Sequence, residues 1–300
     1  MVLNIALLVF LVVTWGYSWV MMKIGLGFMG PFTLATWRCA VGSLGMFPLL
    51  KGIPWPKREK WPYYVAVGLL QTTGMFGLML HGMKFVTAGK TSVLLYTMPL
   101  WTSLLAHFYL KEKLNASRWV GVISGGIGIL CILGWDTLVN QSAQILFGEF
   151  LVIAGAVSWA IANIVIKKQM PNENAYMVNG LQMPIGTLGL ALLSLPVEGL
   201  WHIKWTWVSV GVILFTGVVA STINFTIWFY LLKKLDTHTA ASASMLVPVF
   251  GLLFDWLQLG KGLDTGVIVG GVLILAGIYQ VSKRQKSDKD YGRRKEAASQ

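Results

Sequence analysis

Hydrophobic residues along this chain fall in runs separated by short polar stretches. A helix of about 20 apolar residues is long enough to cross the hydrocarbon core of a bilayer. Scanned with a window of about 19 residues, the chain contains ten such runs. They cover residues 3–22, 31–50, 62–81, 87–110, 117–134, 147–166, 176–195, 206–231, 239–259 and 264–282. The pattern predicts an all-α integral membrane protein with ten transmembrane helices.

The composition supports a membrane protein and argues against a soluble one. Hydrophobic residues make up 55% of the chain and charged residues 12%, and the mean hydropathy is +0.65. A soluble domain carries about 25% charged residues, so this chain has too few charges to cover a soluble surface. Cys39 and Cys131 both lie within apolar runs, which indicates no disulfide framework, metal site or cofactor site. The first run lacks the basic start of a signal peptide, so we interpret it as the first membrane helix.

The basic residues predict how the chain is oriented. The formal net charge is +12, and the Lys and Arg residues lie between the apolar runs and in the tail. This distribution indicates no nucleic-acid partner. Eighteen of them fall on one side of the predicted topology and five on the other. Because cytoplasmic loops are enriched in Lys and Arg, both termini are predicted to be cytoplasmic, although the first helix alone, with Lys23, favours the opposite orientation. The basic tail, 283–300, is predicted to be disordered and to lie near anionic lipid.

An internal repeat divides the chain into two halves. The segment that starts at Thr91 aligns without gaps on the segment that starts at Ala240, at an offset of 149 residues. This alignment places Pro99 on Pro248, Gly121 on Gly270 and Gly128 on Gly277, and at an offset of 144 Trp15 matches Trp159 and Lys23 matches Lys167. Since five helices are an odd number, the second copy must enter the membrane in the opposite direction. The predicted units are residues 1–144 and 145–282, two inverted five-helix repeats of the kind found in secondary transporters, followed by the tail.

Short motifs in both halves resemble the EamA-type transporters of the drug/metabolite transporter superfamily. The resemblance covers about residues 3–282 and rests on Trp15-Gly16 with Lys23, Leu34 through Arg38, Ala88-Gly89, and Pro99 followed by Leu110-Lys111-Glu112. It implies a ten-helix carrier that moves amino acids or other metabolites, mostly outward. One departure from the family pattern concerns Glu112, whose counterpart in the second half is Lys261.

Polar and aromatic residues within the spans are the candidates for substrate contact. Polar side chains in membrane helices tend to face the bundle interior, and transporters with inverted repeats bind substrate near the midplane. The expected substrate-binding residues are Trp15, Tyr17, Trp19, Gln71, Tyr96, Trp159, Asn163, Asn224 and Trp228. Further polar candidates are Ser18, Thr72, Ser158, Gln182 and Ser244. Each polar group could instead join two helices, and each tryptophan could simply fill the core.

Two prolines and three charged residues are candidates for gating. Proline removes a backbone hydrogen bond and bends a helix, so Pro99 and Pro248 could curve two helices around a cavity, or could be tolerated kinks. Arg38 lies within the second span, and an isolated cation there is costly. We therefore expect Arg38 to pair with Glu149 or Asp255, either as structural neutralisation or as an extracellular gate. No acidic residue lies clearly at mid-membrane, so proton coupling is not indicated.

These observations predict a secondary transporter, not an enzyme. It would move a small organic solute across the cytoplasmic membrane by alternating access, with export favoured by the family resemblance. Its expected partners are the solute and membrane lipid. Glycines at 121, 125 and 128 and at 266, 270 and 277 form small-residue faces, which indicate close packing between the halves or a homodimer. The alternatives are a membrane enzyme acting on lipid-linked substrates and a channel or scaffold.

Overall fold

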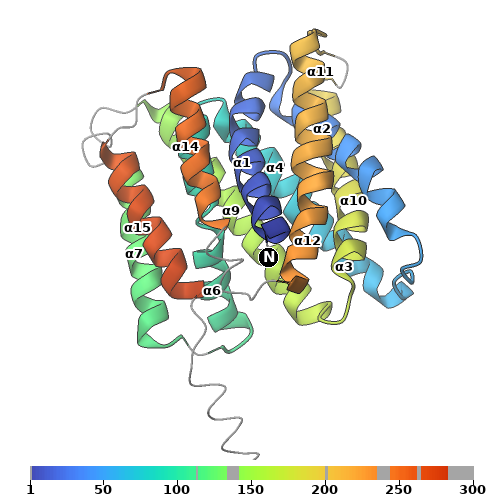
Figure 1. The fold of residues 1–300 in the computed structure, drawn as a ribbon, viewed down its shortest axis with the longest axis horizontal. Coiled ribbons are helices and arrows are strands. Elements are labelled where there is room, and N and C mark those ends of the chain that lie inside the picture. The colour runs from blue at the N-terminus through green and yellow to red at the C-terminus, as the bar shows by residue number, and fades with distance from the viewer. Residues whose placement is uncertain are drawn as a thin grey trace, which may run out of the picture.

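The computed structural model is a bundle of helices (Figure 1). It describes residues 2–112, 114–133, 142–199, 202–234, 244–261 and 265–282. The predicted tail, 283–300, and the start of the predicted ninth span, 239–243, lie outside these residues. The first half comprises α1 (Val2–Gly25), α2 (Pro31–Met46), η1 (Phe47–Leu50), η2 (Arg58–Lys60), α3 (Trp61–Val67), η3 (Gly68–Gly74), α4 (Met75–Met83), α5 (Ala88–Leu95), α6 (Met98–Tyr109) and α7 (Ala116–Leu133). The second half comprises α9 (Ala143–Gln169), α10 (Ala175–Val197), α11 (Trp207–Leu214), η4 (Phe215–Ile223), α12 (Asn224–Lys234), α14 (Leu246–Leu259) and α15 (Thr265–Ser282).

Within the described residues these elements group into ten helical segments. Elements α3, η3 and α4 are continuous and form one segment, and α11, η4 and α12 form another. Helices α5 and α6 count as one segment because they follow each other within one predicted span. Seven of the segments are at least 18 residues long and apolar enough to cross a membrane. The segment Leu246–Leu259 is apolar but shorter. The structure is therefore that of a multi-pass membrane protein.

The two halves interleave rather than stand side by side. Helix α1 packs on α14 and on η4 and α12 of the second half, and α9 packs on α6, α4 and η3 of the first. Helix α2 contacts η4, and α10 contacts η3. Each contact thus occurs twice, with the roles of the halves exchanged, so the buried core lies between the halves.

Helices α7 and α15 make the most extensive helix-to-helix contact among the described elements, at one edge of the bundle (Figure 1). A Cβ atom added to Gly128 would lie 2.6 Å from the carbonyl oxygen of Gly270, and one added to Gly277 would lie 2.5 Å from that of Gly121. The pairing of 121 with 277 and of 128 with 270 shows that the two helices run antiparallel. The small-residue faces therefore pack between the halves, since only glycine allows this approach.

The third and eighth segments each contain a π-helical turn, in η3 and η4. Neither was predicted, and neither contains proline. Side chains from these turns bond to the other half: the Thr73 hydroxyl donates to the Gly186 carbonyl at 2.8 Å, and the Thr222 hydroxyl donates to the Gly42 carbonyl at 3.1 Å. Thr73 and Thr222 are related by the offset of 149, so the bond is duplicated with the halves exchanged. Such π-turns occur frequently at functional sites.

The predicted fourth span, 87–110, is two helices and not one. Helix α5 ends at Leu95, α6 begins at Met98, and Pro99 lies in the first turn of α6. A missing N–H at that position removes no helical hydrogen bond. Pro248 likewise lies in the first turn of α14. The span is therefore interrupted next to Pro99, and both prolines lie where a helix starts; their role in gating stays a prediction.

The glycine contact between α7 and α15 predicts that alanine lowers the stability of the fold at position 128 but not at position 126. Gly128→Ala should destabilise the fold by about 1–3 kcal/mol, because the added methyl group overpacks a backbone contact. Gly126→Ala is the matched control, since a Cβ there meets nothing within 4 Å. Thermal unfolding of the purified variants measures the difference, and equal melting temperatures would contradict this account of the contact.

Candidate functional site

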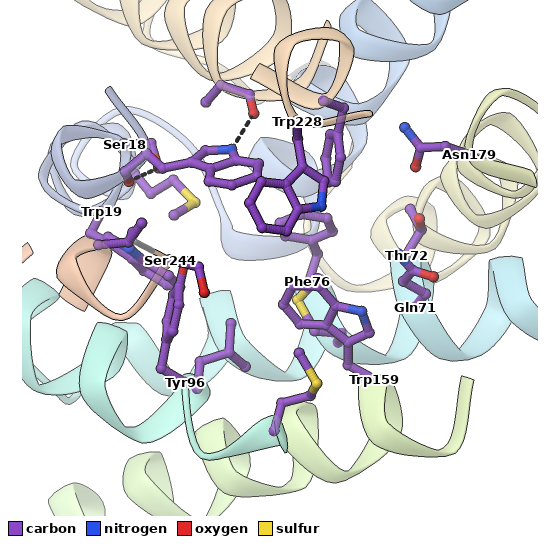
Figure 2. A pocket seen from close by; sticks show the side chains of 18 of the residues that line it. Ser18, Trp19, Gln71, Thr72, Phe76, Tyr96, Trp159, Asn179, Trp228 and Ser244 are labelled. Atoms are coloured by element: carbon purple, nitrogen blue, oxygen red, sulfur yellow. Dashed lines mark hydrogen bonds between the residues drawn. The ribbon is translucent and has the colours of Figure 1, made fainter. Parts of the chain in front are cut away.

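A cavity of about 250 Å³ lies between the two halves, and its walls come from both. Aromatic rings supply much of its surface. They belong to Trp15, Trp19, Phe76, Tyr96, Trp159, Phe225 and Trp228. Figure 2 shows Trp159 of α9 and Trp228 of α12 projecting into the cavity from opposite sides. Methionines fill much of the remaining wall, namely Met22, Met75, Met98, Met183 and Met245.

The π-helical turns help to hold the aromatic rings in place. Trp15 donates from Nε1 to the Ala220 carbonyl in η4 at 2.8 Å, and the Ser158 hydroxyl, next to Trp159, donates to the Leu70 carbonyl in η3 at 2.7 Å. A carbonyl without a partner in the hydrocarbon region costs several kcal/mol, on the order estimated for any unsatisfied buried polar group. Each half thus bonds to the irregular turn of the other; the first bond holds the Trp15 ring at the cavity wall, and the second ties α9 to η3 next to Trp159.

One wall of the cavity is polar but uncharged. Figure 2 shows Gln71, Thr72 and Asn179 together on one side of the cavity. The Thr72 hydroxyl donates to Gln182 Oε1 at 2.7 Å, and Gln182 Nε2 donates to Asn179 Oδ1 at 3.1 Å. Beside these two hydrogen bonds, Asn179 Nδ2 and Gln71 Oε1 are buried and have no partner in the structure. Both atoms are covered by protein atoms in this structure.

Arg38 also lines the cavity, and its side chain is only 4% exposed. Its Nη1 donates to the Met22 sulfur at 2.6 Å and its Nη2 to the Ser221 hydroxyl at 3.3 Å. The guanidinium carbon lies 4.3 Å from the centroid of the Phe76 ring, a distance suited to a cation–π contact. All these contacts are uncharged.

The expected pairing of Arg38 with Glu149 or Asp255 is wrong. Glu149 is fully buried and forms an ion pair with Lys90 at 2.9 Å. Asp255 accepts the backbone N–H of Gly89, in the first turn of α5, at 2.8 Å. The sequence could not distinguish these partners, because all of these residues belong to the same end of the bundle.

The end of the bundle that holds Lys90 and Asp255 is closed. Besides those two contacts, Lys23 donates from Nζ to the carbonyls of Met83 and Val86, at 2.5 and 2.7 Å. The three side chains tie the α4–α5 connection to α1, α9 and α14. Buried apolar residues, including Leu34, Met79 and Val212, complete the core of the bundle.

The opposite end contains a second cavity, of about 310 Å³. Met98 and Pro99 line both cavities, so the two adjoin. Glu112 and Lys167 also line the second cavity and form a partly exposed ion pair at 2.5 Å. The central cavity therefore leads toward this end and not toward the closed one.

The structure gathers many of the predicted residues but not all of them. Trp15, Trp19, Arg38, Gln71, Tyr96, Pro99, Trp159 and Trp228 line the central cavity. Asn163 lines the second cavity, where its Nδ2 contacts the Met98 sulfur at 3.1 Å. Tyr17 packs between Phe215 and Phe254, and Asn224 is fully buried and accepts a hydrogen bond from Thr14. Neither of these, nor Pro248, is among the residues that line a cavity.

Several lining residues were not predicted. Asn179 lies three residues before Gln182, on the same face of α10, and that spacing was a usable signal. Phe76, Phe225 and the methionines carry no such signal, because the same residue types fill the core elsewhere. Among the described residues, no group of three or more His, Cys, Asp or Glu side chains could hold a metal ion.

Comparisons with known proteins place the chain among transporters. The model of the EamA-like transporter family matches residues 3–134 and 146–283. A Bacillus subtilis (strain 168) protein named "Uncharacterized transporter YoaV" is 36% identical, with 88% of this chain and 91% of that protein covered. A Salmonella typhimurium protein named "Probable amino-acid metabolite efflux pump" is 32% identical, with 92% of each covered. A solved crystal structure at 17% identity has a TM-score of 0.65 and covers 92% of this chain and 95% of that chain, which supports the fold alone.

The buried Lys90–Glu149 ion pair predicts that a second substitution restores the stability lost by the first. Lys90→Met should destabilise the fold by about 3 kcal/mol, because it leaves the buried Glu149 without its cation. The double variant Lys90→Met/Glu149→Gln should recover most of this loss. Thermal unfolding measures both, with Lys84→Met, which removes an exposed cation at the same end, as the control. A double variant no more stable than Lys90→Met would contradict the pair's role.

Proposed function

The chain belongs to the EamA-like transporter family, and we propose that it is a secondary transporter that moves a small organic metabolite across the cytoplasmic membrane by alternating access. The family consists of transporters and not enzymes. The observation that carries the proposal is the central cavity, which both halves line, which is closed at one end and which adjoins a second cavity at the other. A site between two halves is where such carriers bind their solute.

The duplicated contacts support alternating access by two inverted halves. Thr73 bonds to the Gly186 carbonyl as Thr222 bonds to the Gly42 carbonyl. Each half makes the same threonine-to-carbonyl hydrogen bond with the other. If the halves exchange conformations, this kind of bond is therefore still made on both sides. Such an exchange would close the open end and open the closed one.

The charge distribution and the relatives support transport out of the cell. We propose that both termini are cytoplasmic, because the Lys- and Arg-rich connections lie at that end. The second cavity, with Glu112 and Lys167, then opens toward the cytoplasm. A solute would enter the central cavity from inside the cell and leave outside. The Salmonella typhimurium relative, named as a probable amino-acid metabolite efflux pump, supports export of an amino acid or a similar solute. The homodimer stays a prediction.

Counterflow in proteoliposomes tests this function. Vesicles that contain the purified chain are loaded with an excess of one unlabelled solute, and uptake of the same solute in labelled form is followed across a panel of amino acids, organic acids and amines. A carrier gives transient, saturable accumulation of at least one solute. A channel gives non-saturable flux and a scaffold gives none, and either result across the whole panel would refute the proposal.

The aromatic wall predicts a transport defect. Trp159→Ala removes a large ring from the cavity and should lower the initial counterflow rate by about tenfold, which corresponds to about 1.4 kcal/mol and lies within the range for an aromatic contact. Trp207→Ala is the control, because that ring is 93% exposed. Equal rates for the two variants, at equal amounts of inserted protein, would show that the cavity is not the path of the solute.

A further inference from the structure

Arg38 is the one charged side chain among the described residues that line the central cavity. Its Nε atom is buried and has no hydrogen-bond partner, and its other nitrogens contact only a methionine sulfur and a serine hydroxyl. No carboxylate of the described residues forms an ion pair with it. Because an arginine side chain stays protonated in proteins, the cavity carries an uncompensated positive charge.

A purely structural role does not account for this charge. A buried ion is costly unless a counter-ion and hydrogen bonds compensate it. Glu149 and Asp255 could have supplied that counter-ion from the closed end, yet they bond to Lys90 and to the Gly89 N–H instead. The fold thus commits its nearby carboxylates elsewhere and leaves Arg38, which lines the cavity, without a counter-ion among the described residues.

Other lining residues also carry buried polar atoms without a partner, and most of these atoms are hydrogen-bond donors, as the nitrogens of Arg38 are. Trp19 Nε1 and Asn179 Nδ2 are buried donors without a partner, whereas Gln71 Oε1 is the matching acceptor. Together with Arg38 Nε, the described lining residues contain three such donors and one such acceptor, all covered by protein atoms in this structure, so a ligand reaches them only when the covering side chains move. A carboxylate only accepts hydrogen bonds and fits the planar fork of arginine. The donor excess therefore selects an anionic, acceptor-rich group.

The rest of the cavity defines the body of the ligand. Rings and methionine side chains form most of the wall, so the body must be apolar or aromatic. The cavity volume of about 250 Å³ lies below the range of about 300–1,000 Å³ for drug-sized ligands, which limits the solute to a small one. The Gln71 oxygen and the ring faces could also receive an ammonium group, so a zwitterionic amino acid fits as well as a simple acid.

We propose that Arg38 binds the carboxylate of the transported solute, and that the substrates are small carboxylates with an apolar or aromatic body, amino acids included. This inference rests on the proposed transport function and narrows it. Arg38 contacts Met22 of α1 and Ser221 of η4, so a carboxylate bound there lies between elements of both halves. Binding compensates the buried charge at the place where the halves meet.

The test compares acids with their amides, which match in shape but lack the anionic charge. The probes are L-leucine and L-leucinamide, L-phenylalanine and L-phenylalaninamide, and 3-phenylpropionate and 3-phenylpropanamide. Binding to the purified full chain is measured by thermal shift over a concentration series, because a ligand stabilises the state that it binds. For the unaltered protein we expect at least one acid to bind about 10- to 100-fold more tightly than its amide, the range for a hydrogen bond to a charged group.

Three variants separate binding from structure. Arg38→Gln should bind the acid as weakly as the amide, and Arg38→Lys, which keeps the charge but not the fork, should lie between. Lys84→Gln removes an exposed cation far from the cavity and should behave as the unaltered protein. Without ligand, Arg38→Gln should melt at the same temperature or higher, because it removes a buried charge that lacks a counter-ion.

Four results would overturn the inference. The first is equal binding of acid and amide by the unaltered protein, and the second is failure of every acid to bind. The third is an acid preference that survives in Arg38→Gln, and the fourth is a lower melting temperature of that variant together with intact binding, which would indicate a structural role. Saturable counterflow of amines or neutral solutes, with none of carboxylates, would refute the carboxylate site and leave the transport function standing. Absence of saturable counterflow for every solute would refute both.

Discussion

The structure depends on the requirement that every backbone polar group in the hydrocarbon region finds a partner inside the protein. Regular helices meet this requirement by themselves, and carbonyls of the irregular turns η3 and η4 accept further hydrogen bonds from side chains of the other half. Trp15 donates to a carbonyl of η4, and Ser158 donates to a carbonyl of η3. The irregular turns thus bind the halves together at the level of the cavity, and η4 holds the Trp15 ring in its wall.

The two ends of the bundle are related by the repeat but close by different chemistry. Glu112 pairs with Lys167 at one end, whereas the matching positions at the other end are Lys261 and Lys23. Two cations cannot form an ion pair, so Lys23 bonds to backbone carbonyls and other residues supply the closure. The Lys90–Glu149 pair is buried, and the Glu112–Lys167 pair is partly exposed. Because exposed ion pairs contribute little, the Glu112–Lys167 pair adds little to the contact between the halves at the second end.

The cavity combines features that rarely occur together in a membrane interior. Its surface is mostly aromatic and sulfur-containing, and its one charged group among the described residues is a cation. Burial in an apolar wall strengthens the field of that cation, because there is little water to screen it. The amide chain of Thr72, Gln182 and Asn179 adds polar contacts of fixed direction. If Arg38 binds the solute, as we propose, such a site distinguishes solutes by charge first and by shape second.

The sequence by itself determined the helical membrane fold, the duplication and the family, since run length, the offset of 149 and ordered motifs are properties of the chain. It also indicated a cavity lined by Trp15, Trp159 and Trp228, because aromatic residues at mid-span depth are few. Only the tertiary structure decided the partners of charged groups: Glu149 bonds to Lys90 and not to Arg38. It also showed the break before Pro99 and the π-turns, because the length of an apolar run does not distinguish a regular helix from an interrupted one. The local sequence indicates how deep a residue lies in the membrane. The partner that its side chain contacts depends on helices that are distant in the chain.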